Sequence, residues 1–316
     1  GTNAVFDFGG GSEFSELALF GELYFMTLND RLQLTLGGRV FRSKADTIAL
    51  DGSTAASSKE DNNILKASAS WSASDSSMFY AQVSQGYRSG AGNTDIPDPP
   101  ANFDTQFGAD TLTNYELGYK GTLFDGKLQA NASVYYIDWQ DIQSQFTTDG
   151  GFLYGGNGGS AHTQGVELEF TATPISSLMI SGSVAYLEAE LDEDVPEADL
   201  IDGQRLPGTP EWTASLNVRS QHNVSNSLTL TPSALITYRD ESFAGFGVDQ
   251  DEVLDAYTRV NLYLELASND GDWSVTLTGE NVTGETPIVQ TYGFRTVRQF
   301  VTIRPRTWGF AFRKSF

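Results

Sequence analysis

Few residues in this sequence have the types and spacing that catalysis requires. His162 and His222 are the only histidines, and neither has a serine or carboxylate partner at the spacing of a catalytic triad. The glycine-rich segment 155–159 neither follows a strand of a parallel sheet nor opens a helix, so we interpret it as a flexible loop rather than a phosphate-binding loop. The sequence therefore predicts no catalytic residues and no cofactor.

Two acidic stretches offer carboxylate oxygens, the ligands that Ca²⁺ prefers. One contains Asp192, Glu193, Asp194, Asp199 and Asp202, and the other contains Asp249, Asp251 and Glu252. Their spacing is irregular, and runs of like charge usually face water. We therefore expect solvated acidic loops and no metal site, with calcium binding as the alternative.

Aromatic residues and arginines gather in the longer polar segments, where they are candidates for ligand binding. Ring faces and guanidinium groups suit bulky, partly anionic ligands such as catecholate or hydroxamate siderophores, through stacking and charge-assisted hydrogen bonds. The alternative is that these side chains only pack the loops together, and the sequence favours neither interpretation. The candidates are Tyr87, Arg88, Phe103, Tyr154, Phe243, Phe246, Tyr292, Phe294 and Arg295.

The composition of the chain excludes several classes of protein. Its 316 residues carry a net charge of −22, which argues against a nucleic-acid partner because phosphate backbones require clustered Lys and Arg. It has no cysteine, so disulfides and thiolate metal sites are impossible. No stretch approaches the roughly 18 consecutive apolar residues of a membrane-spanning helix.

Polarity alternates from residue to residue through most of the chain, as expected of β-strands with one apolar face. Val166, Leu168 and Phe170, for example, alternate with Glu167 and Glu169. A dry core would not hold such polar faces unpaired, whereas a water-filled lumen would. The pattern predicts about thirteen strands, at residues 16–27, 32–44, 65–72, 78–88, 114–123, 128–144, 162–173, 178–190, 211–222, 227–240, 256–267, 273–281 and 307–316.

The connections between these strands alternate between short and long. Tight turns at one rim and long loops at the other are typical of an up-and-down antiparallel barrel in the outer membrane, and soluble sandwiches rarely keep such regularity. The residues 124–127 contain an Asp-Gly pair suited to a tight hairpin turn. All five tryptophans fall near strand ends, as in the aromatic girdles at membrane interfaces.

The last strand, 307–316, has an aromatic face formed by Trp308, Phe310, Phe312 and Phe316. We interpret this face as directed at lipid. Closed antiparallel barrels of single bacterial chains have an even number of strands, so thirteen strands imply that an odd number precedes residue 1 in a longer chain. We expect these residues alone to form an open, curved sheet or a strained small barrel, with 307–316 paired to 273–281.

Several short motifs resemble one family when they are taken in order. They are residues 78–90 (MFYAQVSQGYRSG), 114–121 (NYELGYKG), 164–169 (QGVELE), 206–212 (LPGTPEW), 256–261 (AYTRVN), 280–283 (ENVT) and 306–310 (RTWGF). Between residues 16 and 316 the chain resembles the TonB-dependent outer-membrane receptors.

The resemblance implies a barrel of 22 strands, the size class of plugged outer-membrane transporters. Residues 1–316 then form the C-terminal portion of the barrel domain, without the first strands, the plug or the TonB-contacting box. The implied function is active uptake of a scarce ligand, first of all a ferric siderophore, with energy supplied through a TonB-type partner. The terminal aromatic residues, including Phe316, resemble the signal read by barrel-assembly machinery.

Three alternatives remain at this stage. Cobalamin or an oligosaccharide could replace the siderophore as ligand. A passive porin-like or structural barrel would lack energy coupling, and an outer-membrane enzyme would need a catalytic constellation in the lumen or at the rim. In the preferred interpretation the chain is no enzyme, and its partners are outer-membrane lipid, a small ligand, the energiser and the assembly machinery.

Overall fold

The computed structural model describes residues 10–49, 51–94, 96, 99, 103–148, 152–196, 200–245, 253–294 and 297–315. Phe246, Arg295 and Phe316, which the sequence analysis singled out, lie outside these described residues. Within the described part, every regular element is a β-strand. A search of the same residues for helices long and apolar enough to cross a membrane found none.

One antiparallel sheet contains most of the strand residues, with thirteen strands in sequence order and β14 (His222–Asn223) paired beside β15. The predicted number of main strands is therefore confirmed. In spatial order they are β1 (Gly10–Thr27), β2 (Leu32–Ala49), β3 (Thr54–Ser74), β4 (Ser77–Arg88), β7 (Asp110–Leu123), β8 (Leu128–Gln140), β11 (Ala161–Ile175), β12 (Leu178–Leu191), β13 (Trp212–Ser220), β15 (Leu228–Arg239), β18 (Tyr257–Ser268), β19 (Trp273–Glu280) and β22 (Thr307–Lys314).

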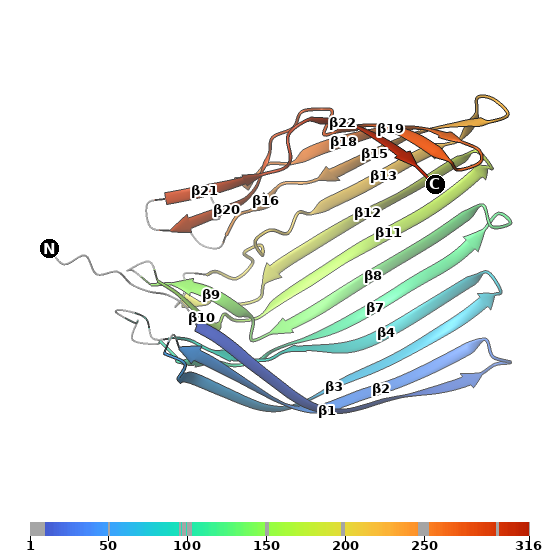
Figure 1. Ribbon diagram of the computed structural model, residues 1–316. Helices are drawn as coiled ribbons and strands as arrows, with labels where there is room; N and C mark the ends of the chain where they lie inside the picture. Colours follow the sequence, from blue (N-terminus) through green and yellow to red (C-terminus); the bar gives the residue numbers. More distant parts are fainter. Residues whose placement is uncertain are drawn as a thin grey trace.

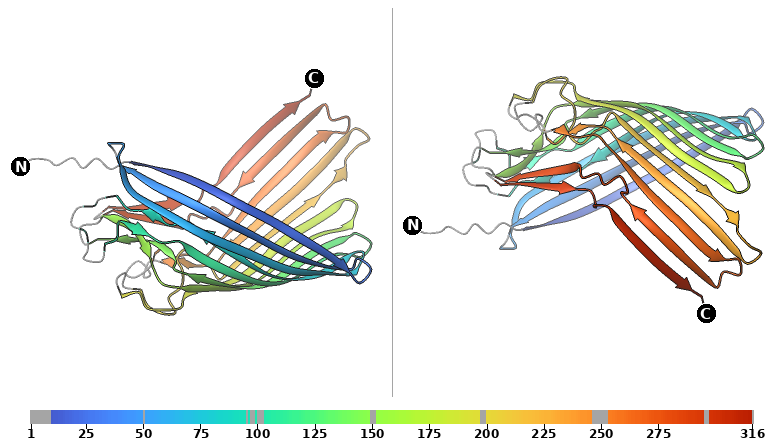
Figure 2. Two further views of the ribbon diagram at one scale, coloured as in Figure 1. Left: turned by 90° about the horizontal axis from the view of Figure 1, so that it is seen from below. Right: turned by 90° about the horizontal axis from the view of Figure 1, so that it is seen from above.

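The sheet curves into a trough whose two long edges are β1 and β22 (Figure 1). These two strands are the ends of the pairing order and are not paired with each other. Views from below and from above show the curvature of the sheet (Figure 2). The expectation of an open, curved sheet is confirmed.

Short turns close the hairpins at one end of the trough. Leu28, Asn29 and Asp30 have φ of 54°, 54° and 63° in the β1–β2 turn. In the β7–β8 turn, Asp125 has φ of 56° and Gly126 of 85°, the left-handed conformation expected for the Asp-Gly pair. These turns leave the paired strands in register, so the apolar faces of neighbouring strands coincide.

The opposite end, which we call the outer rim, is more ordered than the sequence predicted. The segment 45–61, expected as a loop, instead continues β2 to Ala49 and begins β3 at Thr54, and the two strands pair as a hairpin. Continued pairing satisfies the backbone hydrogen bonds of this polar segment better than a loop would. At its tip, hydrogen bonds from the Ser53 hydroxyl and backbone N–H lower the pKa of the Asp51 carboxyl.

Four small two-stranded sheets also form within the long connections at this rim. The segment 155–159, expected as a flexible loop, lies mostly in one of these strands. The pairs are β5 (Ala91–Gly92) with β6 (Gln106–Phe107), β9 (Gln143–Thr147) with β10 (Leu153–Asn157), β16 (Ser242–Phe243) with β17 (Val253–Leu254), and β20 (Ile288–Phe294) with β21 (Val297–Thr302).

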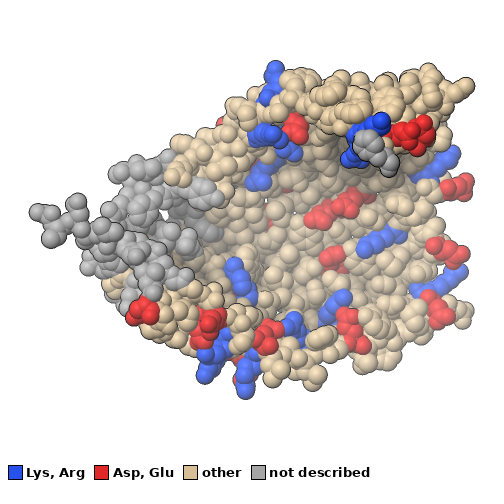
Figure 3. Space-filling model, viewed as in Figure 1, with Lys and Arg blue, Asp and Glu red and all other residues tan. Residues whose placement is uncertain are grey.

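The strand register separates an apolar outer face from a polar inner face. One row of directly paired side chains crosses the outer face from β2 to β11. Its members are Leu34, Ala69, Ala81, Leu117, Val134 and Val166. Leu117 is 58% exposed, as expected for a side chain that faces lipid. On the hollow inner side, charged side chains are scattered among neutral ones (Figure 3).

The terminal strand pairs as predicted. β22 is antiparallel to β19, with Trp308 opposite Gly279 and Lys314 opposite Trp273. A Cβ atom on Gly279 would lie 2.6 Å from the Trp308 ring, so the glycine lets the ring lie against the backbone of the neighbouring strand. Trp308 and Phe310 are each 69% exposed, which fits the interpretation of a lipid-facing aromatic strand.

The two faces predict different costs in stability for an introduced positive charge. We expect Leu117→Arg to lower the free energy of unfolding by about 2–4 kcal/mol, because the guanidinium would face hydrocarbon near the membrane midplane. Ser133→Arg is the control, since Ser133 lies on the inner face opposite Glu167; we expect it to cost less than about 1 kcal/mol. Denaturant titration of the receptor in lipid vesicles measures both, and equal costs would contradict the assignment of faces.

Candidate functional site

An ion pair between the half-exposed Arg88 and the buried Asp110 forms the base of the candidate site at the outer rim. Asp110, at the start of β7, is 3% exposed and accepts a hydrogen bond from Arg88 Nε at 3.0 Å. Arg88 ends β4, and its guanidinium lies 5.8 Å from the ring centre of Trp139 in β8. The pair therefore joins the outer ends of three neighbouring strands, and the positive charge of Arg88 is balanced by the Asp110 carboxylate.

Gln143 ties the loops above this base to the barrel wall. Its backbone N–H donates to Asp110 at 3.2 Å, and its carbonyl accepts from Arg88 Nη2 at 3.2 Å. Its side-chain amide nitrogen lies within 3.2 Å of the carbonyls of Arg88, Ser89 and Gly108. The loops 89–109 and 141–160 thus share one set of hydrogen bonds.

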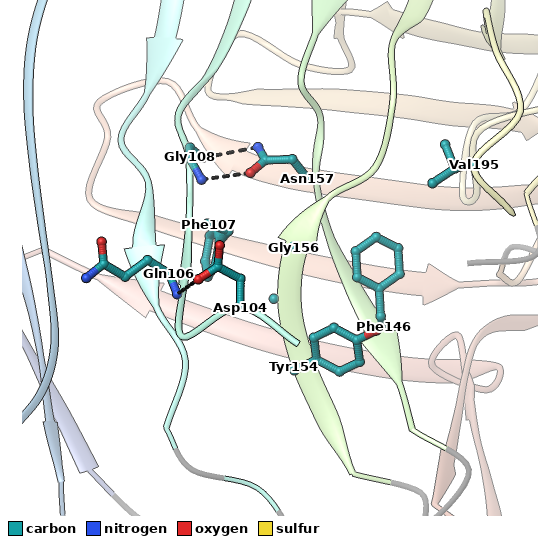
Figure 4. Close-up of a pocket in the computed structure, with 10 residues that line it drawn as sticks. Asp104, Gln106, Phe107, Gly108, Phe146, Tyr154, Gly156, Asn157 and Val195 are labelled. Atoms are coloured by element: carbon teal, nitrogen blue, oxygen red, sulfur yellow. Dashed lines mark hydrogen bonds between the residues drawn. The ribbon is translucent and has the colours of Figure 1, made fainter. Parts of the chain in front are cut away.

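Two further amide side chains hold these loops together. Asn157 accepts from the Gly108 N–H at 2.7 Å and donates to the Gly108 carbonyl at 3.2 Å, as the dashed lines in Figure 4 show. Asn93, which is 8% exposed, donates to the carbonyls of Asp104 and Gly155 at 2.8 Å each and accepts from the Gly155 N–H at 2.7 Å. β6 and β10 are thereby fixed side by side.

A pocket of about 360 Å³ lies between the two loops (Figure 4). It is walled by aromatic rings, by the backbone of β10 and by polar groups that include the Asp104 carboxylate. Its lining residues are Asp104, Gln106, Phe107, Gly108, Phe146, Tyr154, Gly155, Gly156, Asn157 and Val195. Val195 comes from the acidic loop after β12, so three long connections meet at this pocket.

The aromatic rings of the pocket depend on the glycines of β10. A Cβ atom on Gly155 would lie 2.5 Å from the Phe107 ring, and one on Gly156 would lie 2.6 Å from the Phe146 ring. Tyr154 contacts Phe146 and Phe103, with ring centres 5.6 Å and 5.7 Å apart. The glycine-rich segment therefore allows the two aromatic rings to pack directly against its backbone.

The arrangement suits recognition of a planar, aromatic ligand more than reaction. Ring faces offer stacking, while amide groups and one carboxylate offer directional hydrogen bonds. Arg88 is held by Asp110, so it does not present a free cation to the pocket.

The sequence-based candidates are only partly brought together. Tyr154 lines the pocket, and the Phe103 ring contacts the Tyr154 ring. Tyr87 instead lies against Phe41, with ring centres 4.8 Å apart, and donates a hydrogen bond to Glu60. Phe243 is elsewhere at the rim, 5.2 Å beneath the Arg205 guanidinium. The role of all these residues in ligand binding stays a prediction.

Two more candidates, Tyr292 and Phe294, belong to β20, which pairs with β21. Sequence reasoning did not propose Phe107, Phe146, Asn93, Gln143 or Asn157 as site residues. The glycines next to Tyr154 were the available signal, because adjacent glycines in a strand indicate close approach of another group.

The fold and the site together define a class of protein. An antiparallel sheet with an apolar outer face, a polar inner face, tight turns at one end and folded loops at the other is the wall of an outer-membrane β-barrel. Residues 1–282 match the family model described as TonB dependent receptor-like, beta-barrel. The chain belongs to this family, which confirms the resemblance seen in the motifs, and it is located in the outer membrane.

The curated relatives that match are named as receptors. The chain is 27% identical to the metal-pseudopaline receptor CntO of Pseudomonas aeruginosa over 193 residues, which cover 60% of this chain and 25% of that protein. It is 30% identical to the pesticin receptor of Yersinia enterocolitica over 164 residues, which cover 51% of this chain and 23% of that protein. The matches thus span about a quarter of the length of these relatives.

Solved structures show the same fold. The ferric yersiniabactin uptake receptor FyuA of Yersinia pestis superposes with a TM-score of 0.80 at 22% identity, covering 97% of this chain and 46% of that one. The ferric preacinetobactin receptor BauA of Acinetobacter baumannii gives 0.74 at 20% identity, covering 95% and 43%. The family and these neighbours are receptors and transporters rather than enzymes, as the sequence predicted.

The ion pair between Arg88 and the buried Asp110 gives a test of the base of the site. We expect Asp110→Ala to raise hydrogen exchange in β9 and β10, by destabilising them about 1–3 kcal/mol, because Arg88 and the Gln143 N–H lose their acceptor. Asp61→Ala is the control, since its pair with Arg42 is 69% and 72% exposed; its cost at β2 and β3 should stay below about 1 kcal/mol. Unchanged exchange in β9 and β10 would show that the loops do not depend on Asp110.

Proposed function

We propose that this chain is the C-terminal portion of the barrel domain of an active-transport receptor that captures a ferric siderophore or similar metal chelate. The supporting observation is the aromatic pocket at the outer rim of a barrel of this family. The pocket opens where a ligand arriving from outside would first meet the protein. Residues 1–316 are one domain in this proposal.

The chemistry of the pocket favours a ligand with aromatic rings. Phe107, Phe146 and Tyr154 offer ring faces and edges, and stacked aromatic pairs contribute about 0.5–1.5 kcal/mol beyond the area they bury. The pocket volume of about 360 Å³ lies at the small end of ligand sites, so it suits one part of a chelate rather than the whole. We assign it as a capture subsite for an aromatic arm of the ligand.

The names of the relatives point to the same ligand class without fixing the compound. One matched protein is a metal-pseudopaline receptor, and two structural neighbours are receptors for ferric yersiniabactin and ferric preacinetobactin. Transport through the lumen requires a plug and coupling to a TonB-type energiser, which we propose for the whole receptor. The terminal aromatic strand is proposed as the segment that barrel-assembly machinery recognises.

Uptake by the whole receptor tests this function. A strain lacking the receptor gene, grown under iron limitation with single defined ferric siderophores, should recover growth with at least one of them when the wild-type gene is restored. The Tyr154→Ala, Phe146→Ala double variant should lower the affinity for that siderophore about tenfold, since two ring contacts of about 0.5–1.5 kcal/mol are removed.

Phe243→Ala is the matched control, because Phe243 is an aromatic residue of the same rim that stacks on Arg205 away from the pocket. Affinity should be unchanged in this variant. Equal losses of siderophore affinity in the double variant and in Phe243→Ala would show that the pocket is not the capture site. Growth that is independent of the receptor with every siderophore would exclude iron uptake as its function.

A further inference from the structure

A histidine and two glutamates meet on the outer face of the β11–β12 hairpin, near the outer rim and away from the aromatic pocket. Each of His162, Glu188 and Glu190 offers one atom that could bind a metal ion, and these three atoms lie within 4.8 Å of one another. His162 is opposite Glu190 in the strand register, and Gln164 is opposite Glu188. All three side chains are half-buried, and they project from two directly paired strands.

The imidazole of His162 is held in one orientation. Its Nδ1 lies 2.6 Å from Asp192 Oδ1, and its ring stacks on Tyr136 with centres 5.8 Å apart and planes 17° apart. The other ring nitrogen, Nε2, is then directed at Glu188, 3.9 Å from Oε1. A histidine whose second nitrogen is hydrogen-bonded to a carboxylate is the usual arrangement of a metal ligand, because the carboxylate fixes the ring and raises its basicity.

Glu188 is positioned in the same way from its own side. Gln164 Nε2 donates to Glu188 Oε1 at 2.8 Å, and the Tyr186 hydroxyl donates to Oε2 at 3.2 Å. These supporting side chains come from the same two strands, so both ligands are fixed by a rigid part of the sheet.

The local charge also favours a cation. Glu188, Glu190 and Asp192 surround His162, and Asp138 of β8 is directly opposite it in the register. Three carboxylates thus lie around one imidazole, with a fourth on the neighbouring strand, and a divalent ion would offset their mutual repulsion.

The cluster lies above the membrane belt rather than within it. Tyr136 is level with Glu188 on the same outer face, and Tyr186 and Trp212 lie one outward-facing pair nearer to the short turns. Aromatic residues of this kind mark the membrane interface. The carboxylates therefore lie at the level of water and head groups, where a cation from the medium can reach them.

We infer that His162, Glu188 and Glu190 bind one divalent transition-metal ion of the zinc class, with Asp192 orienting the histidine. One imidazole nitrogen and carboxylate oxygens form a donor set that suits Zn²⁺ and is poor for Ca²⁺ and Mg²⁺, which prefer oxygen alone. Bonds of about 2.1 Å require the ligand atoms to approach to roughly 3.4 Å, a small side-chain movement from the present separations. The ion would fasten β11 to β12 where the acidic loop begins at Asp192.

Metal titration of the full chain in detergent micelles tests this site. Isothermal calorimetry with ZnCl₂ should give one ion per chain, and CaCl₂ and MgCl₂ should bind at least tenfold more weakly. The single variant His162→Ala should weaken Zn²⁺ binding by tenfold or more. The double variant Glu188→Gln, Glu190→Gln should do the same. The glutamines keep the size of the side chains and leave hydrogen-bonding groups for Gln164 and Tyr186, so the sheet should stay folded.

Asp240→Asn is the matched control, because Asp240 is also a rim carboxylate that accepts a hydrogen bond from a tyrosine two residues earlier, Tyr238. Zn²⁺ affinity should be unchanged in this variant, and circular dichroism without metal should be alike in all of them. The inference is overturned if Zn²⁺ does not bind, if the double variant binds it normally, or if Asp240→Asn weakens binding equally. Because no siderophore is present, the result is independent of the proposed uptake function.

Discussion

Backbone pairing across the membrane is the constraint on which the rest of the structure depends. In hydrocarbon, no water is available to an unpaired N–H or C=O group, so each strand of the wall must be hydrogen-bonded on both sides. The uninterrupted order from β1 to β22 meets this requirement for every strand between the two edges. It also explains why pairing fixes the register so strictly: a slip of one residue would turn a lipid-facing leucine such as Leu117 into the lumen.

The same two-residue period decides where functional side chains lie beyond the membrane. The face that carries Val166 and Leu168 continues at the outer end of β11 into Gln164 and His162, so the metal cluster is the polar extension of the lipid-facing row. The inner face ends instead in Asp110 of β7 and supports the loops above the lumen. One strand pattern therefore supplies two chemically different rims, one toward the head groups and one toward the lumen.

The wall was predictable from sequence and the rim was not. Alternating polarity located all thirteen main strands and the pairing of β22 with β19, because these depend on neighbours along the chain. The strand nature of 45–61 was missed, since this polar segment carries no alternating apolar face. The pocket was missed for a different reason: Asn93 bonds to Gly155, which is 62 residues away, and Gln143 bonds to Arg88, 55 residues away. No local pattern reports such contacts, which is also why Arg88 was read as a ligand-binding cation and not as the partner of Asp110.

The chemistry of the loop contacts suggests how such a rim can change its ligand while the wall stays constant. Asn93, Gln143 and Asn157 hold the loops mainly through backbone carbonyl and N–H groups, and such bonds do not restrict the side chain of the partner residue. The positions that do restrict identity are Gly155 and Gly156, where any Cβ atom would overlap an aromatic ring. Substitutions at the remaining lining positions can therefore alter the surface offered to a ligand without releasing the loops from the ion pair beneath them. In the proposed capture subsite, the groups that anchor the loops are therefore separate from the side chains that would contact a ligand.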